Sequence, residues 1–295
     1  MPGHPVSWLW ELPYDFLRIT KPGLTSLVLF TTFVGFYAGV QGPLPLALLF
    51  HTLAGTALVA GGAAAFNMYV ERQLDMLMKR TALRPIASGR LQAGHALVFA
   101  MVISAGGFVY LYLLVNHLAS VLSAIIFAGY LFLYTPLKTR TWWSTFIGAV
   151  PGALPAVLGW TAATRSVSFE SWSLFIIVFL WQMPHFYAIG WRHREDYEHA
   201  GFSLLPAVVG GERRIRWLAP CFILALIPAA SLPYITGIAG GIYLIGSSLL
   251  GILFFFFGLH FSRSMSNRSA HRLFIVSALY LPALLVLLIV DKTVR

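Results

Sequence analysis

Nine long apolar stretches alternate with short polar segments along the chain of 295 residues. A helix that spans a bilayer needs about 20 mostly apolar residues, and each stretch is close to that length. The predicted spans are 24–41, 45–68, 94–114, 117–135, 144–163, 171–190, 216–235, 239–259 and 271–290. The pattern therefore predicts an all-α integral membrane protein with nine transmembrane helices, forming a single transmembrane domain over residues 1–295.

Residues 1–22, before the first span, mix aromatic, apolar and charged side chains: Trp8, Trp10, Glu11, Leu12, Asp15, Phe16, Leu17, Arg18 and Lys21. Such a mixture is typical of an amphipathic helix lying in the membrane interface. No apolar signal-peptide core precedes the first span, and the acidic residues argue against a mitochondrial transit peptide.

Composition supports the membrane assignment. The chain is 58% hydrophobic and 10% charged, whereas soluble domains carry about 25% charged residues. Its single cysteine, Cys221, excludes an internal disulfide and a multi-cysteine metal site. The net charge of +10 does not indicate nucleic-acid binding, because the Lys and Arg residues fall between the spans.

The distribution of cations also predicts orientation. With the N-terminus in the cytoplasm, all of the 20 Lys and Arg residues lie on the cytoplasmic side except Arg165, Lys292 and Arg295. Cytoplasmic segments of membrane proteins are enriched in these residues. The two long polar loops, 69–93 and 191–215, are therefore predicted to be cytoplasmic.

The first of these loops begins with three oxygen-bearing side chains at helical spacing. Asn67, Glu71 and Asp75 are separated by four residues each, which places them on one face of a helix. Cations accompany them: Arg72, Lys79, Arg80 and Arg84. Mg²⁺ prefers oxygen ligands and Arg binds phosphate oxygens bidentately, so the stretch predicts a magnesium–diphosphate site. The plainer alternative is a helix end with solvated charges.

Two further segments carry candidate residues. Lys138 closely follows an apolar helix and can reach a phosphate as a point charge. His185 follows Pro184 near the edge of the sixth span, where an ionisable group is a functional candidate. A core histidine bonded to the backbone is the alternative for His185, and a solvated loop acid is the alternative for Asp196.

Together these motifs resemble the UbiA superfamily of intramembrane prenyltransferases. The first is similar to the family's Asn-x-x-x-Asp-x-x-x-Asp, with Glu71 where Asp is usual. The continuation 78–85, the segments 134–138, 152–155 and 159–160, and the combination Trp181-Gln182-Met183-Pro184-His185-Phe186 with Asp196-Tyr197 resemble its protohaem IX farnesyltransferase (haem O synthase) branch. The resemblance covers nearly the whole chain. The usual pair of Asp residues at i, i+4 is missing from the second motif, where Arg192 stands four before Asp196.

The resemblance implies transfer of farnesyl from farnesyl diphosphate to a vinyl group of haem b, giving haem O. It implies Mg²⁺ held by Asn67, Glu71, Asp75 and Asp196, with diphosphate bound by Arg80, Arg84 and Lys138. His185 and Tyr197 are the candidates for the haem side. It further implies a UbiA-type bundle surrounded by lipid in the cell inner membrane, with a haem A synthase or oxidase-assembly factors as candidate partners.

Two other functions fit parts of the sequence. Another UbiA-type enzyme, prenylating a quinone precursor or esterifying a chlorophyll precursor, would share the first motif. A secondary transporter is disfavoured, because transporters place their sites near the bilayer midplane and these spans are almost free of acids.

Overall fold

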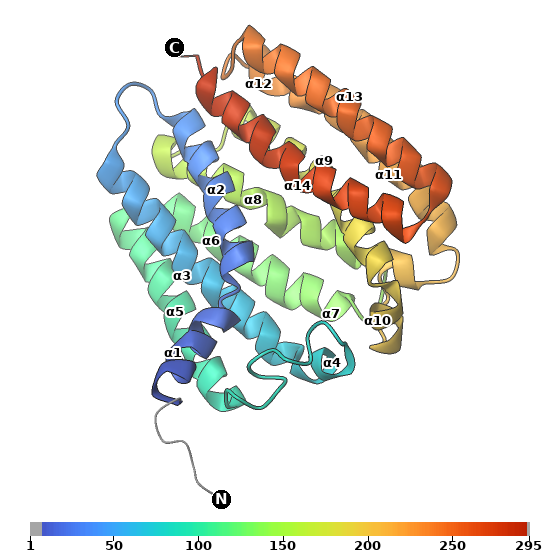
Figure 1. Cartoon of the computed structure of the whole chain (residues 1–295). Helices are drawn as coiled ribbons and strands as arrows, with labels where there is room; N and C mark the ends of the chain where they lie inside the picture. The colour runs from blue at the N-terminus through green and yellow to red at the C-terminus, as the bar shows by residue number, and fades with distance from the viewer. Residues whose placement is uncertain (1–7, 294–295) are drawn as a thin grey trace, which may run out of the picture.

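The computed structural model describes residues 8–293, with side chains from residue 12 onward. This part of the chain forms, in order, α1 (Trp8–Ile19), α2 (Pro22–Gly39), α3 (Leu46–Val70), α4 (Arg72–Leu77), α5 (Ala93–Leu114), α6 (His117–Ala128), η1 (Gly129–Tyr134), α7 (Thr135–Leu137), α8 (Ser144–Thr164), α9 (Phe169–Arg192), α10 (Arg194–His199), η2 (Leu205–Ala207), α11 (Gly211–Ala230), α12 (Leu232–Ile235), α13 (Gly241–Ser264) and α14 (Asn267–Val290). The long helices pack as a bundle, and α4, α7 and α10 lie at one end of it (Figure 1).

Within residues 8–293, nine helical segments are long and apolar enough to cross a membrane. They are α2, α3, α5, the run α6–η1–α7, α8, α9, the run α11–α12, α13 and α14. The predicted all-α membrane fold with nine spans is therefore confirmed.

Several helices extend beyond the predicted spans. Helix α11 begins at Gly211 rather than residue 216, and α13 continues to Ser264 rather than ending at 259. The added turns contain arginines, whose long side chains carry the charge away from the apolar surface. Hydropathy marks the part of a helix suited to hydrocarbon, and the helical hydrogen bonds continue past that limit.

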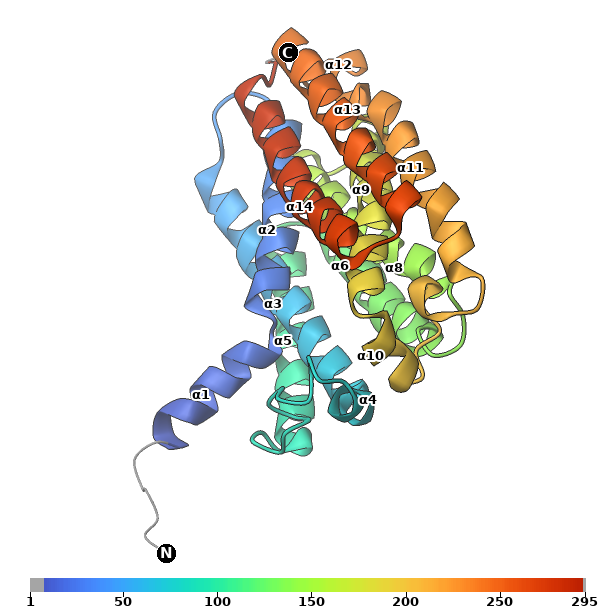
Figure 2. The ribbon, with the colours of Figure 1, turned by 45° about the vertical axis from the view of Figure 1, so that its right-hand side comes forward.

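The predicted N-terminal helix is present as α1, which projects away from the bundle (Figure 2). Its first part, with the side chains of Trp8, Trp10 and Glu11, lies outside the residues whose side chains are described. Farther along, Asp15 is buried and accepts a hydrogen bond from Arg90 Nε at 3.1 Å. This ion pair joins α1 to the loop that precedes α5.

Small residues let neighbouring helices of the bundle pack closely. A Cβ added to Gly35 of α2 would lie 1.9 Å from the Ala156 carbonyl oxygen of α8, and one added to Gly159 would lie 1.9 Å from that of Thr32. In α3, a Cβ on Gly62 would lie 2.0 Å from Ser104 Oγ. Such close approach is common in membrane bundles, where small side chains let backbones meet.

Helix α6 continues into a π-helical turn, η1, before α7 ends the span. One extra residue per turn shifts the side chains that follow around the helix axis, and π turns often occur at functional sites. In this chain η1 carries Tyr130 and Tyr134, and both line the cavity described next.

Candidate active site

The three oxygen-bearing residues of the first motif lie side by side and are buried. Asn67, Glu71 and Asp75 are 1%, 6% and 0% exposed. Glu71 N donates to Asn67 O at 2.9 Å, and Asp75 N donates to Glu71 O at 2.8 Å. These bonds carry the helical register from α3 into α4, which keeps all three side chains on one face.

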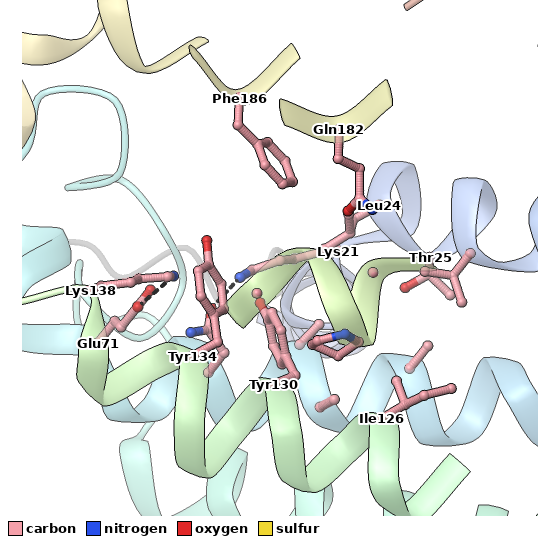
Figure 3. Close-up of a pocket in the computed structure, with 18 of the residues that line it drawn as sticks. Lys21, Leu24, Thr25, Glu71, Ile126, Tyr130, Tyr134, Lys138, Gln182 and Phe186 are labelled. Atoms are coloured by element: carbon pink, nitrogen blue, oxygen red, sulfur yellow. Dashed lines mark hydrogen bonds and ion pairs between the residues drawn. The ribbon is translucent and has the colours of Figure 1, made fainter. Parts of the chain in front are cut away.

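Each of these oxygens binds a cation from a different segment. Lys21 Nζ donates to Asn67 Oδ1 at 2.6 Å, and Lys138 Nζ donates to Glu71 Oε1 at 2.7 Å (Figure 3). Arg84 Nη1 donates to both Asp75 carboxylate oxygens, at 2.7 and 2.8 Å. Charge-assisted bonds of this length are strong and fix geometry. Three cations therefore hold the first motif, and two of them pair with its carboxylates; these six side chains form one polar cluster.

The side chains of this polar cluster shift one another's pKa values. Burial favours the neutral form of Glu71, but Lys138 and Lys21 hold the pKa of that carboxyl below its ordinary value. Burial, followed by the Arg84 guanidinium, lowers the pKa of Lys21 to about 7. Burial opposes the charge of Lys138, yet Tyr134 and Glu71 raise its pKa above the ordinary lysine value. A carboxylate and an ammonium therefore coexist within this buried cluster.

A cavity of about 320 Å³ extends from this polar cluster into the bundle. Its polar end is formed by the motif and its cations. Its remaining wall comes mostly from apolar side chains of α2, α3, α6 and α8, including Leu24, Val28, Ala60, Ala63, Ala64, Ile126, Pro151 and Pro155. In Figure 3, Tyr130 and Tyr134 rise from one side of the cavity, and Gln182 and Phe186 point in from α9 opposite.

The second polar loop packs over this polar end. Arg80 Nη2 donates to Tyr197 Oη at 3.2 Å, and Met78 shares a small apolar cluster with Phe202. Ser203 N donates to the Lys138 carbonyl oxygen at 2.7 Å. The two loops, which are far apart in the sequence, are thus joined above the cavity.

Seven of the residues predicted from sequence line this one cavity: Asn67, Glu71, Asp75, Arg80, Arg84, Lys138 and Tyr197. Asp196 and His185 do not. Asp196 is half-buried in α10. His185 lies between α9 and α14, with Nδ1 2.8 Å from Ser277 Oγ and its ring stacked on Trp181 at 4.9 Å.

The chain resembles known proteins along most of its length. Residues 28–284 match the UbiA prenyltransferase family. The chain belongs to this family and is a prenyltransferase. Over 287 residues it is 43% identical to a protoheme IX farnesyltransferase of Solibacter usitatus (strain Ellin6076), covering 94% of this chain and 98% of that one. The protein of that name from Koribacter versatilis (strain Ellin345) is 38% identical over 290 residues, with 95% and 94% covered.

Solved structures show the same fold at low sequence identity. A digeranylgeranylglyceryl phosphate synthase superposes with a TM-score of 0.80 at 17% identity, covering 95% of this chain and 98% of the other. A UbiA homologue from Archaeoglobus fulgidus bound to GPP and Mg²⁺ gives 0.66 at 19% identity, with 93% and 99% covered. The bundle is therefore a UbiA-type fold in a multi-pass membrane protein.

The side-chain oxygen atoms of the first motif suit a hard cation. Asn67, Glu71 and Asp75 offer amide and carboxylate oxygens to the same cavity, which is the donor type that Mg²⁺ prefers. Within residues 8–293, no three His, Cys, Asp or Glu side chains are gathered closely enough to hold a metal by themselves. Three oxygen donors on one face of a helix leave the rest of the shell of such a cation to substrate phosphates.

Sequence reasoning missed several residues of the site, chiefly Lys21 and Gln182. Lys21 appeared only as one of the N-terminal cations. Its backbone lies in the left-handed region, with φ of 49°, where the chain turns from α1 into α2. Such backbone conformations are costly for residues with a side chain and occur at functional sites. Pro22-Gly23 signals a turn at this point, but not the direction in which the Lys21 side chain points.

Proposed function

We propose that this protein transfers a farnesyl group from farnesyl diphosphate to a vinyl group of haem b, giving haem O. The cavity carries the proposal, because cations and carboxylates form one end and apolar side chains form most of the rest. That division suits a diphosphate attached to a hydrocarbon chain. The relatives named protoheme IX farnesyltransferase support haem as the acceptor. The whole chain would act as a single transmembrane domain.

The cations are held where diphosphate oxygens would arrive. Arg80, Arg84 and Lys138, joined by Lys21, surround the polar end of the cavity. They would bind the diphosphate and stabilise the negative charge that develops on it as the allylic C–O bond breaks. Mg²⁺, when bound, would neutralise further charge on the leaving group. Asn67, Glu71 and Asp75 would hold it, with Asp196 as a fourth ligand.

The apolar walls have a separate role. They would enclose the farnesyl chain and keep bulk water away from the allylic carbon as it gains positive charge. The vinyl group of the haem would then attack that carbon.

His185 and Tyr197 are proposed for the haem side. Ser277 fixes the His185 ring through Nδ1, which leaves Nε2 for the haem iron or another haem contact. Haem binding to His185→Ala, measured by absorbance titration, tests this role. An affinity equal to that of the unchanged protein would remove His185 from the site.

We further propose that the protein lies in the cell inner membrane, with its N-terminus and both polar loops in the cytoplasm and with lipid around the bundle. A haem A synthase or oxidase-assembly factors would be its partners. Accessibility of cysteines introduced into residues 69–93 to a membrane-impermeant thiol reagent tests the orientation, on a background lacking Cys221. Labelling from the extracytoplasmic side would contradict it.

Product analysis tests the proposed reaction. Protein reconstituted with Mg²⁺ and farnesyl diphosphate should convert haem b into its hydroxyethylfarnesyl derivative and release diphosphate. The alternative is a UbiA-type reaction on an aromatic quinone precursor or another lipophilic acceptor. Prenylation of 4-hydroxybenzoate, with haem b left unchanged, would favour that alternative and reject the haem assignment.

A further inference from the structure

Gln182 of α9 presents a hydrogen-bond acceptor to the cavity. The residue is 5% exposed and lines the cavity, into which its side chain points (Figure 3). Its Nε2 donates to the carbonyl oxygens of Ala149 and Val178, at 3.2 and 3.1 Å. Both amide hydrogens are therefore used, while none of the described residues donates to Oε1. The oxygen is not sealed inside the protein, so it can accept a hydrogen bond from a molecule in the cavity.

The position of that oxygen is fixed by its neighbours. The two donated bonds tie the amide to α8 and to its own helix. Gly152 of α8 faces the oxygen so closely that an added Cβ would lie 2.2 Å from Oε1. Any larger residue at 152 would displace the carbonyl. The lack of a side chain at this position therefore leaves room for Oε1 beside the cavity.

We propose that Gln182 Oε1 positions the water molecule that supplies the hydroxyl group of the product. This inference rests on the proposed function. The allylic C–O bond breaks with its electron pair leaving on diphosphate, and the vinyl π pair forms the new C–C bond. The positive charge passes to the vinyl carbon next to the pyrrole ring. The water oxygen then bonds to that carbon, and its proton goes to the released diphosphate.

An amide oxygen suits this role for two reasons. It accepts a hydrogen bond from the water, which directs the lone pairs of the water oxygen away from the acceptor. The negative end of the carbonyl dipole also faces the developing positive charge, and a fixed dipole in an enclosed site stabilises charge effectively. Phe186, one turn along α9, and Pro151 add apolar wall to the same cavity, so a water molecule there depends on the few polar groups present.

The proposal predicts a change in product, not only in rate. Without a held water, the haem-side cation would lose a proton and give an olefin lighter than the hydroxylated product by one molecule of water. In Gln182→Leu, the ratio of hydroxylated to olefinic product should fall about fivefold, which corresponds to one hydrogen bond of typical strength. Gly152→Ala, which keeps the amide and displaces its oxygen, should lower the ratio in the same direction. Liquid chromatography with mass spectrometry measures both products.

Phe179→Leu is the matched control, because Phe179 lies on the same helix but does not line the cavity, and its product ratio should equal that of the unchanged protein. A purely structural role for Gln182 would lower total turnover and leave the ratio unchanged. Exclusively hydroxylated product from Gln182→Leu or Gly152→Ala, with diphosphate release confirming an active protein, would overturn the proposal. If the unchanged protein yields no farnesylated haem, the proposed function itself fails, which is a distinguishable result.

Discussion

The two polar loops at one end of the bundle are organised to different degrees. In the first, Glu71 and Asp75 are almost fully buried and each binds a cation at 2.7 Å. In the second, the side chain of Glu195 is 86% exposed, and its nearest cation, Arg194, lies 3.6 Å away. Asp196 is half-buried and lines no part of the cavity.

The difference lies in what packs beneath each loop. The first continues a helix of small residues that is pressed against α5, so its side chains are fixed before any ligand arrives. The second begins at the end of α9 and reaches the site through Tyr197 and Phe202 at the cavity wall. We infer that the first loop is a preformed binding surface and that the second mainly covers it.

The largest effect is expected from Asp75→Asn. Loss of the carboxylate removes a metal ligand and the partner of Arg84, so kcat should fall about 10²–10³-fold, as for other charge-stabilising groups in active sites. Diphosphate release in reconstituted membranes measures it. Glu195→Gln, in the second loop, is the control and should match the unchanged protein. Near-normal turnover of Asp75→Asn at saturating Mg²⁺ would make the metal assignment wrong.

A large effect on stability is expected from Lys138→Met. The change leaves Glu71 buried without its cation, and breaking a buried pair in this way costs about 3 kcal/mol or more. The double variant with Glu71→Gln should regain much of this stability but not the activity. Thermal unfolding of the purified proteins, read beside turnover, separates the two effects. Equal stability of Lys138→Met and the unchanged protein would argue that the pair is not coupled.

A smaller loss is expected from Asp196→Asn. If Asp196 joins the metal once substrate binds, turnover should fall about 10–100-fold, comparable to the loss of an outer metal-site group. The Mg²⁺ concentration for half-maximal activity should rise as well. Unchanged Mg²⁺ dependence and turnover would remove Asp196 from the ligand set and leave the second loop as a cover alone.

The smallest effect is expected from Tyr197→Phe, which removes the 3.2 Å hydrogen bond between the loops. One such bond contributes about 1 kcal/mol, so the KM for farnesyl diphosphate should rise about fivefold with little change in kcat. Steady-state kinetics at fixed haem b measure this. A large fall in kcat instead would assign Tyr197 a role in the reaction itself.

The sequence alone determined the class of the protein and one half of its site. Nine apolar stretches require nine membrane helices, because backbone groups in hydrocarbon must bond within their own segment. Helical spacing placed Asn67, Glu71 and Asp75 on one face, and the cations beside them indicated a diphosphate. Both inferences depend on contacts within one segment, for which the order of residues is sufficient.

Which distant residues complete that face depends on the packing of the helices. Lys21 and Lys138 reach the motif from segments more than 40 residues away on either side, and helix packing sets those distances. It also turned Gln182 and Phe186 toward the cavity and His185 toward α14, although the three belong to one short motif. Residues of one helix face different neighbours, and which neighbour each one meets depends on the crossing of α8, α9 and α14.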